Sequence, residues 1–202
     1  MAYRNFQFSE LEQKFGLKRA KTVLFDKPIT PVMPSAYLLE SIERTKKVRL
    51  TTEKAVSEAI VFPILAELKF LNQQKIELFS GESIVADRAM GLTGECDFIF
   101  VKDPTAMELT FPIIAITEAK RGDINNPRSL AQATAQLLGA YIYNQNNNSP
   151  MSVIYGACTS GYEWHFIKLE NSTAIFDEDR YSIADLPELL GALQKIIDIQ
   201  TA

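Results

Sequence analysis

Residues 91–143, GLTGECDFIFVKDPTAMELTFPIIAITEAKRGDINNPRSLAQATAQLLGAYIY, predict two strands followed by a helix. Residues 93–102 are rich in β-branched and aromatic side chains, which favour a strand. Residues 111–120 are almost continuously apolar, which is typical of a strand covered on both faces of a sheet. Ser129 is expected to cap a helix that runs to about Asn144. This order predicts an α/β fold arranged around the second strand.

Further helices and strands are expected on both sides of this stretch. The segment before it predicts helices at residues 9–15, 34–45 and 51–71 and a short strand at 75–79. The first helix is expected to have Ser9 and Glu12 as a capping box and to end at Gly16, and Pro63 is expected to kink the third. Ser80 and Gly81 are expected to form a turn. The segment after it predicts a hairpin of residues 151–158 and 162–169, a short strand at 174–176 and a helix from Asp185 to about 199.

We therefore expect one α/β domain over residues 1–202, with a mixed central β-sheet flanked by helices. Residues 1–50 would form a helical N-terminal extension, about 51–170 the core, and about 185–199 a C-terminal helix. A chain of 202 residues is long enough to bury a sizeable core.

Composition narrows the class of protein. The formal net charge of −4 argues against a protein that coats nucleic acid non-specifically, because such binding depends on neutralising phosphates. The N-terminus lacks the basic-then-apolar order of a secretory signal, and the sequence has no apolar run long enough to span a bilayer. We therefore expect a cytoplasmic protein without a membrane segment. The two cysteines, Cys96 and Cys158, are interpreted as small buried hydrophobes.

Three charged side chains lie within the two predicted central strands. Strand residues alternate between faces, so Asp97 is expected to share a face with Glu95, Ile99 and Val101. By the same rule, Glu118 and Lys120 are expected to share a face with Ile114 and Ile116. Charges beside such apolar strands are costly unless they are paired or bind a metal ion.

These residue types suit a divalent cation. Mg²⁺ prefers hard oxygen ligands and keeps several water molecules. Asp97, Glu118 and the backbone carbonyl of Ala119 are the candidate ligands. Lys120, stabilised in its charged form by the carboxylates, is a candidate either to orient a metal-bound water molecule or to donate to negative charge that develops on a phosphate.

A strand acid, a Glu-x-Lys motif on the next strand and a glutamine-containing helix together resemble the PD-(D/E)XK, or restriction-endonuclease-like, superfamily. The resemblance covers roughly residues 51–169. The hairpin VIYGACTSGYEWHFIKLE is also similar to a segment of the nuclease-like domain at the N-terminus of type I restriction subunits and of stand-alone bacterial relatives.

The resemblance implies a DNA endonuclease of restriction, repair or mobile-element origin that uses Mg²⁺ or Mn²⁺. It implies that Asp97 and Glu118 bind the metal ion and that Lys120 is the catalytic lysine. It also suggests a further metal ligand, Glu58, on the helix before the sheet. Site residues on the later helix would be Gln132 and Gln136. DNA is the implied partner, and a homodimer is expected because cutting both strands often requires two sites.

Several alternatives remain open. Cys96 stands where the motif name has proline, and Glu95 could replace Asp97 as ligand. The charged residues could instead form an ion pair at the end of a strand. The fold could also be catalytically silent and bind nucleic acid or a protein partner. A metal hydrolase that is not a nuclease is less favoured, because basic residues near the motif, such as Arg121 and Arg128, suit a polyanion. The only histidine, His165, is interpreted as a half-buried strand residue.

Overall fold

The computed structural model describes residues 2–120, 122–149 and 151–202, and it is an α/β structure with an eight-stranded mixed sheet. The strands are β1 (Lys18–Thr22), β2 (Glu77–Asp87), β3 (Leu92–Val101), β4 (Ile113–Ala119), β5 (Val153–Thr159), β6 (Glu163–Glu170), β7 (Thr173–Asp177) and β8 (Tyr181–Ser182). The α-helices are α1 (Phe8–Phe15), α2 (Ala36–Thr45), α3 (Glu53–Val56), α4 (Phe62–Leu71), α5 (Pro127–Asn146) and α6 (Leu186–Thr201). Short turns of 3₁₀-helix at Tyr3–Asn5 and Ile183–Asp185 and a π-helical turn at Ser57–Val61 complete the elements.

The sheet has the strand order β1-β7-β6-β5-β4-β3-β2, and β8 pairs with β6. Strands β2, β3 and β4 form an antiparallel meander, and β5 lies parallel to β4. Helix α5 is the crossover that this parallel pairing requires. The expected β5–β6 hairpin is confirmed, and β7 extends it in an antiparallel sense.

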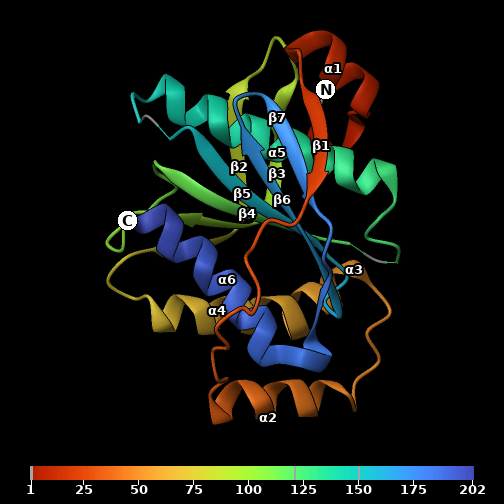
Figure 1. Ribbon diagram of the computed structural model, residues 1–202, viewed down its shortest axis with the longest axis vertical. Coiled ribbons are helices and arrows are strands. Elements are labelled where there is room, and N and C mark those ends of the chain that lie inside the picture. The colour runs from red at the N-terminus through yellow and green to blue at the C-terminus, as the bar shows by residue number, and fades with distance from the viewer. Residues whose placement is uncertain (1, 121, 150) are drawn as a thin grey trace.

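Helices cover both faces of the sheet (Figure 1). On one face α2, α4 and α6 pack on a cluster that includes the buried side chains of Leu65, Trp164 and Leu189. On the other face α1 and α5 pack on a cluster that includes Tyr3 and Leu137. Every residue of β4 is buried between these layers, which confirms the predicted central strand. No helix among the described residues is long and apolar enough to cross a membrane.

The expected alternation of faces in β3 is interrupted beside Asp97. Cys96 packs in the same core cluster as Ile99 and Val101, where a strict period of two would separate them. Gly81 lies opposite Asp97, between the pairs Ser80–Phe98 and Glu82–Cys96, and its φ of 72° departs from extended geometry. The predicted turn at Ser80 and Gly81 is therefore wrong, because both residues lie inside β2. An irregularity of this kind changes the direction of nearby side chains.

The expected common face of Ile114 and Ile116 is also wrong. Ile114 packs with the α4 and α6 side and Ile116 with the α5 side. The reason is a register shift between β3 and β4 beside Val101, which inserts an extra residue at the start of β4. The shift lies before Ile116, so the alternation that places Glu118 on the α5 side is kept.

The predicted helix at residues 51–71 is a series of three segments. Helix α3 leads into the π-helical turn, and α4 begins at Phe62, with Pro63 in its first turn. Pro63 cannot donate a backbone hydrogen bond, which the wider turn before it accommodates. In place of the expected kink at Pro63, the helix changes from a π-helical turn to an α-helix just before the proline.

Two predicted helix caps are wrong. Helix α1 is capped by Gln7 with Glu10, which lie two residues before the expected Ser9 and Glu12. Helix α5 is capped by Asn126 rather than Ser129, because Pro127 already occupies its first position. The expected start of the last helix at Asp185 and the end of α1 at Gly16 are confirmed, and Ser35 caps α2 at the start of the helix expected over residues 34–45.

Residues 1–50 do not form a purely helical extension. They contain β1, which pairs in parallel with β7 at the edge of the sheet. All five residues of β1, KRAKT, are exposed, so the strand lacks the apolar pattern that would have revealed it. The N-terminal segment is therefore part of the central sheet.

Gly191 provides a test of how α6 is packed. A Cβ atom at this position would lie 2.3 Å from the backbone oxygen of Thr30. We expect Gly191→Ala to lower the free energy of unfolding by about 1–3 kcal/mol, because overpacking outweighs the gain in helix propensity. Urea denaturation measures this change. Lys195→Ala in the same helix is the control and should change stability by less than about 0.5 kcal/mol; equal effects of the two substitutions would contradict this packing.

Candidate active site at the end of the central strands

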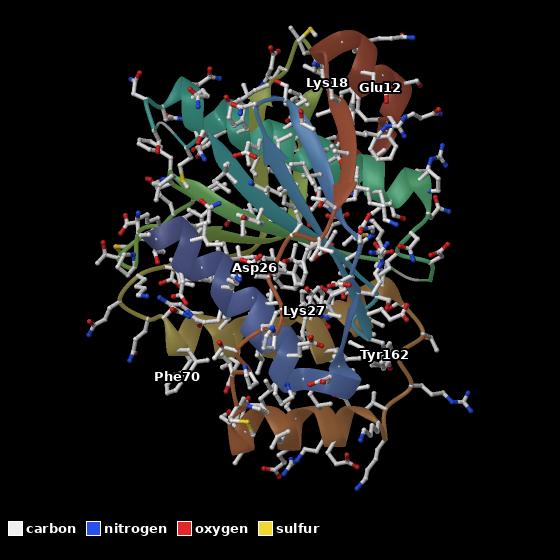
Figure 2. The ribbon with its side chains drawn as sticks, in the orientation of Figure 1. Glu12, Lys18, Asp26, Lys27, Phe70 and Tyr162 are labelled. Carbon is white, nitrogen blue, oxygen red and sulfur yellow. The ribbon has the colours of Figure 1, made fainter. Side chains whose placement is uncertain are left out.

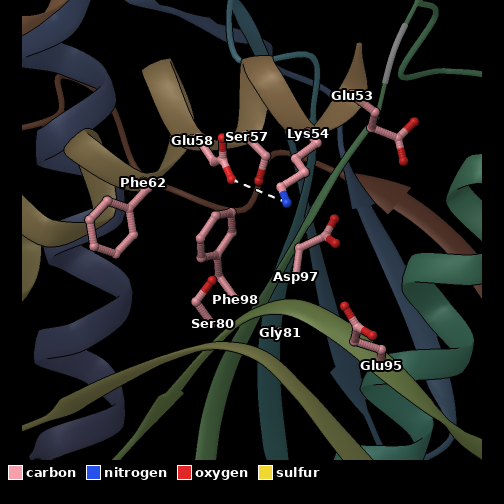
Figure 3. A pocket seen from close by; sticks show the side chains of 10 residues that line it. All are labelled: Glu53, Lys54, Ser57, Glu58, Phe62, Ser80, Gly81, Glu95, Asp97 and Phe98. Carbon is pink, nitrogen blue, oxygen red and sulfur yellow. Dashed lines mark ion pairs between the residues drawn. The ribbon is translucent and has the colours of Figure 1, made fainter.

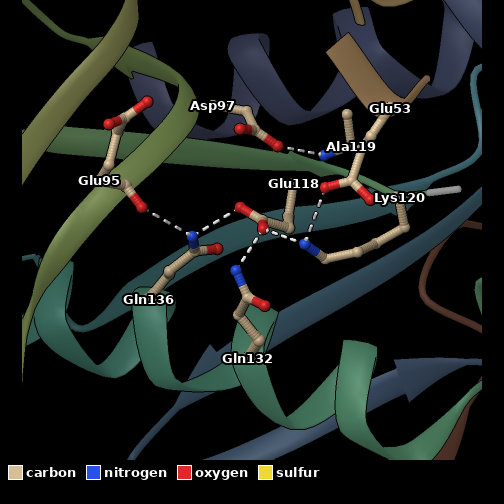
Figure 4. Close-up of polar contacts among 8 residues, drawn as sticks. All are labelled: Glu53, Glu95, Asp97, Glu118, Ala119, Lys120, Gln132 and Gln136. Carbon is tan, nitrogen blue, oxygen red and sulfur yellow. Dashed lines mark hydrogen bonds and ion pairs between the residues drawn. The ribbon is translucent and has the colours of Figure 1, made fainter. Parts of the chain in front are cut away.

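Glu118 is the most buried charged residue among the three that the sequence singled out. It lies near the end of β4, and its side chain is 3% exposed. Lys120 Nζ donates to its Oε1 at 2.6 Å, and Gln132 donates to the same oxygen. Gln136 Nε2 donates to Oε2 at 2.6 Å (Figure 4). Both carboxylate oxygens are thus held by glutamines of α5, and Lys120, which directly follows β4, adds a second donor to Oε1.

The two glutamines reach Glu118 because α5 crosses the face of β4. They are four residues apart, so they lie one turn apart on the same side of the helix. Gln136 is fully buried and also donates to the backbone carbonyl of Glu95 at 3.3 Å. The structure therefore brings Gln132 and Gln136, the two helix residues that the resemblance suggested, to the same carboxylate.

Asp97 approaches the same region from β3. Its Oδ2 accepts a hydrogen bond of 2.7 Å from the backbone N–H of Ala119. Ala119 follows Glu118 directly, so this contact joins the two acidic residues through the backbone of β4 (Figure 4). The contact uses the amide of Ala119, and the predicted role of its carbonyl as a metal ligand stays a prediction.

Lys120 pairs with two acidic residues. Besides Glu118, its Nζ lies 3.5 Å from Glu53 Oε1, at the start of α3. Sequence reasoning missed Glu53 and chose Glu58 from the same helical segment. The side chain of Glu58 is 67% exposed and pairs with Lys54 at 3.7 Å. A signal for Glu53 was available, because the residue directly follows the N-cap Thr52 and the first turn of a helix favours carboxylates.

Burial and mutual repulsion disturb the acid groups of the site. Burial raises the pKa of Glu118 from 4.5 to about 7, and Asp97 adds to the rise, while Lys120 and Gln136 oppose it. Burial also raises the pKa of Asp97, against the stabilising hydrogen bond from Ala119. For Lys120, burial alone would lower the pKa, but Glu118, Glu53 and Asp97 together raise it. Lys120 is therefore charged at neutral pH, and the site holds more carboxylates than cations.

A cleft of about 580 Å³ opens beside Asp97, between the start of α3 and the β2–β3 strands (Figure 3). Its acidic lining residues are Glu53, Glu58, Glu95 and Asp97. Lys54 is the basic residue among those that line it. The expectation of basic residues around the site is thus not met on this wall. Arg121, one of the basic residues named from the sequence, lies outside the described residues.

The donor set fits a hard divalent cation. Asp97 and Glu118 offer carboxylate oxygens, which Mg²⁺ and Mn²⁺ prefer. The carboxylates outnumber the cations and repel one another, and a bound cation would reduce this repulsion. Among the described residues, however, no group of three or more His, Cys, Asp or Glu side chains is arranged to hold a metal ion. A metal ion here would therefore be held by a small protein ligand set and by water.

Comparison of the sequence with protein-family models and with curated proteins finds no match.

The raised pKa of Glu118 makes stability depend on pH. In the folded state the group keeps its proton up to about pH 7, whereas its unperturbed pKa is 4.5. Between these values the folded state binds more protons than the unfolded state, so the free energy of unfolding falls as pH rises. We expect Glu118→Gln, measured in EDTA by urea denaturation, to remove this part of the fall. Parallel stability curves for the two proteins between about pH 4.5 and pH 7 would contradict the assignment.

Proposed function

We propose that this protein is a divalent-metal-dependent nuclease of the PD-(D/E)XK type that hydrolyses phosphodiester bonds in DNA. The observation that carries the proposal is the buried Glu118 carboxylate, bound by Lys120, Gln132 and Gln136 at the end of a central strand. Asp97 lies close to Glu118, because it accepts a hydrogen bond from the backbone amide of the next residue, Ala119. Charged groups so placed are costly unless they serve a site.

The arrangement of elements supports the restriction-endonuclease-like fold within the α/β class. Helix α4 directly precedes the β2–β3–β4 meander of the sheet, and the resemblance likewise has a helix before these strands. The acid lies on β3, the Glu-x-Lys motif spans the end of the neighbouring β4, and the glutamine helix α5 follows directly. The antiparallel β5–β6 hairpin is the last part of this series of elements. This order of strands and helices is compatible with the proposed family.

The residues around the two carboxylates hold them in position. Gln132 and Gln136 donate to opposite oxygens of Glu118, which restricts rotation of its carboxylate. The Ala119 amide does the same for one oxygen of Asp97. Groups that are positioned before the substrate binds lose little free energy on reorganisation during the reaction. Residues Asp97 and Glu118, with the Ala119 carbonyl, would hold the metal ion.

A bound Mg²⁺ or Mn²⁺ would lower the pKa of a water molecule and offset the negative charge that builds on the phosphate. Lys120 is suited to help as a positively charged donor rather than as a general base, because the surrounding carboxylates keep it protonated. With its side chain 15% exposed, Lys120 remains within reach of a substrate oxygen. The proposed partner is DNA, and a homodimer would supply the two sites needed to cut both strands.

A second candidate function is a catalytically silent fold of the same type that binds a partner. The acidic wall of the cleft favours it, because carboxylates repel the phosphates of DNA unless a cation lies between them. The two functions differ in whether the site binds a metal ion and cuts.

Cleavage of double- and single-stranded DNA with Mg²⁺ or Mn²⁺ tests the proposal. Asp97→Asn and Lys120→Met keep the approximate shape of each side chain and remove its charge. We expect each to reduce the rate by a factor on the order of 10² or more, as for other groups that act on the transition state.

Glu58→Gln is the matched control for these variants. It removes a carboxylate that lines the same cleft and pairs with the exposed Lys54. We expect it to retain activity within about threefold. Cleavage that survives both Asp97→Asn and Lys120→Met would overturn the assignment of these residues, and absence of cleavage by the intact protein on every DNA form would favour the silent fold.

A further inference from the structure

A second hollow lies away from the acidic cleft, where the edge strand β1 and its neighbour β7 meet the start of α5. Its volume is about 500 Å³, and the side chains that decide its chemistry are Phe8, Arg19, Lys21, His165, Phe176 and Arg180. A neighbouring hollow, also of about 500 Å³, shares Phe8, Arg19 and Pro127 with it and adds Arg128. Together they form one continuous groove, which we call the basic groove.

The charge of the basic groove is opposite to that of the cleft beside Asp97. Its charged lining residues are Arg19, Lys21, Arg128 and Arg180, and no Asp or Glu is among the described residues that line it. In a protein of net charge −4, such a concentration of cations is a local feature. It selects for an anionic ligand.

The cations of the basic groove differ in how far their charges are already paired with other groups of the protein. Arg19 pairs with Glu12 at 2.7 Å and lies over the ring of Phe8, and Glu12 lies on α1 close to β1 (Figure 2). Arg180 donates to the side-chain oxygen of Asn125 and to backbone carbonyls of its own turn. Lys21 is exposed and has no ion-pair partner among the described residues. Lys21 is thus the cation most available to a ligand.

His165 supplies an independent sign of a ligand. The residue is 3% exposed and lines the basic groove, and neither ring nitrogen makes a hydrogen bond of full geometry with the described residues, although the backbone of Asp177 lies close to the ring. Burial, together with Arg180, lowers its pKa to about 4, although the nearby Asp177 backbone opposes the change. The ring is therefore neutral at physiological pH and offers one donor and one acceptor. Buried polar groups without fully formed hydrogen bonds are rare in native proteins, which sets this ring apart from the other side chains of the groove.

One wall of the groove is aromatic. Phe8 and Phe176 meet edge to face, with ring centroids 5.8 Å apart, and His165 lies 5.9 Å from Phe176. Both phenylalanines are only partly buried, so they leave apolar ring surface facing the groove. Planar bases pack well on such surfaces. The start of the 20-residue helix α5 borders the same groove at Pro127, where the helix dipole favours negative charge.

We propose that the basic groove binds a nucleotide, with the phosphate against Lys21, Arg19 and the start of α5, and the base against Phe8, Phe176 and His165. The ligand is defined by the pairing of an anionic phosphate with a planar, hydrogen-bonding ring. It can be a free mononucleotide or the end of a nucleic-acid strand, since both present these groups. The groove uses none of the residues assigned to the metal site, so the two proposals stand independently.

Nuclear magnetic resonance of His165 tests the proposal directly, because this residue is the only histidine in the chain. The full-length protein would be titrated, in EDTA to exclude metal-dependent binding, with adenosine 5′-monophosphate, with inorganic phosphate and with a 5′-phosphorylated tetrathymidylate. We expect the ring signals of His165 to shift with the first and third probes. Adenosine 5′-monophosphate should bind roughly tenfold more tightly than phosphate, because the base adds its packing on the aromatic wall. The tighter of the two nucleotide probes identifies the source of the ligand.

Charge reversal on β1 provides matched variants. Lys21→Glu removes the available cation and should weaken nucleotide binding by roughly tenfold. Lys18→Glu makes the same change on the same exposed strand but outside the groove lining, and should leave binding nearly unchanged. The proposal is overturned if no nucleotide probe shifts the His165 signals, if phosphate binds as tightly as adenosine 5′-monophosphate, or if both variants weaken binding equally.

Discussion

The burial of Glu118 is the constraint on which the candidate site depends. A carboxylate that is 3% exposed beside an apolar strand is costly to ionise, and the chain surrounds it with donors from β4 and α5. These donors also fix how α5 crosses the sheet, because Gln132 and Gln136 can reach Glu118 only from that face. Asp97 accepts a hydrogen bond from the backbone amide of Ala119, the residue after Glu118, and adds a second carboxylate. The fold thus concentrates negative charge that Lys120 offsets only in part.

Charge is divided between two regions of the molecule. The cleft beside Asp97 is lined by carboxylates, whereas the basic groove at the start of α5 is lined by arginines and a lysine. A polyanion would meet repulsion at the first region without a cation and attraction at the second. The net charge of −4 conceals this division, since it averages over both surfaces. A cation in the cleft and a nucleotide in the groove would each complete a surface whose charge is otherwise unbalanced.

Sequence patterns predicted the central elements because those elements are strongly apolar. The buried strand β4 and the hairpin β5–β6 follow from periodicity and turn signals, whereas Gln132 and Gln136 were suggested by the family resemblance alone. Patterns failed where tertiary contacts decide the local structure. The polar edge strand β1 is stabilised by pairing with β7, and the backbone of Gly81 changes the alternation beside Asp97. Glu53 was missed in favour of Glu58, because helical spacing alone does not show which of two nearby carboxylates faces Lys120.

The central claim is that Asp97 and Glu118 bind one divalent cation together. Anomalous diffraction from crystals soaked in Mn²⁺ tests it most directly, because the metal ion is located without reference to activity. We expect a single anomalous peak within coordination distance, about 2.0–2.3 Å, of an oxygen from Asp97 and of an oxygen from Glu118. A peak bound by neither residue, or the absence of a peak at saturating Mn²⁺ near pH 8, would contradict it.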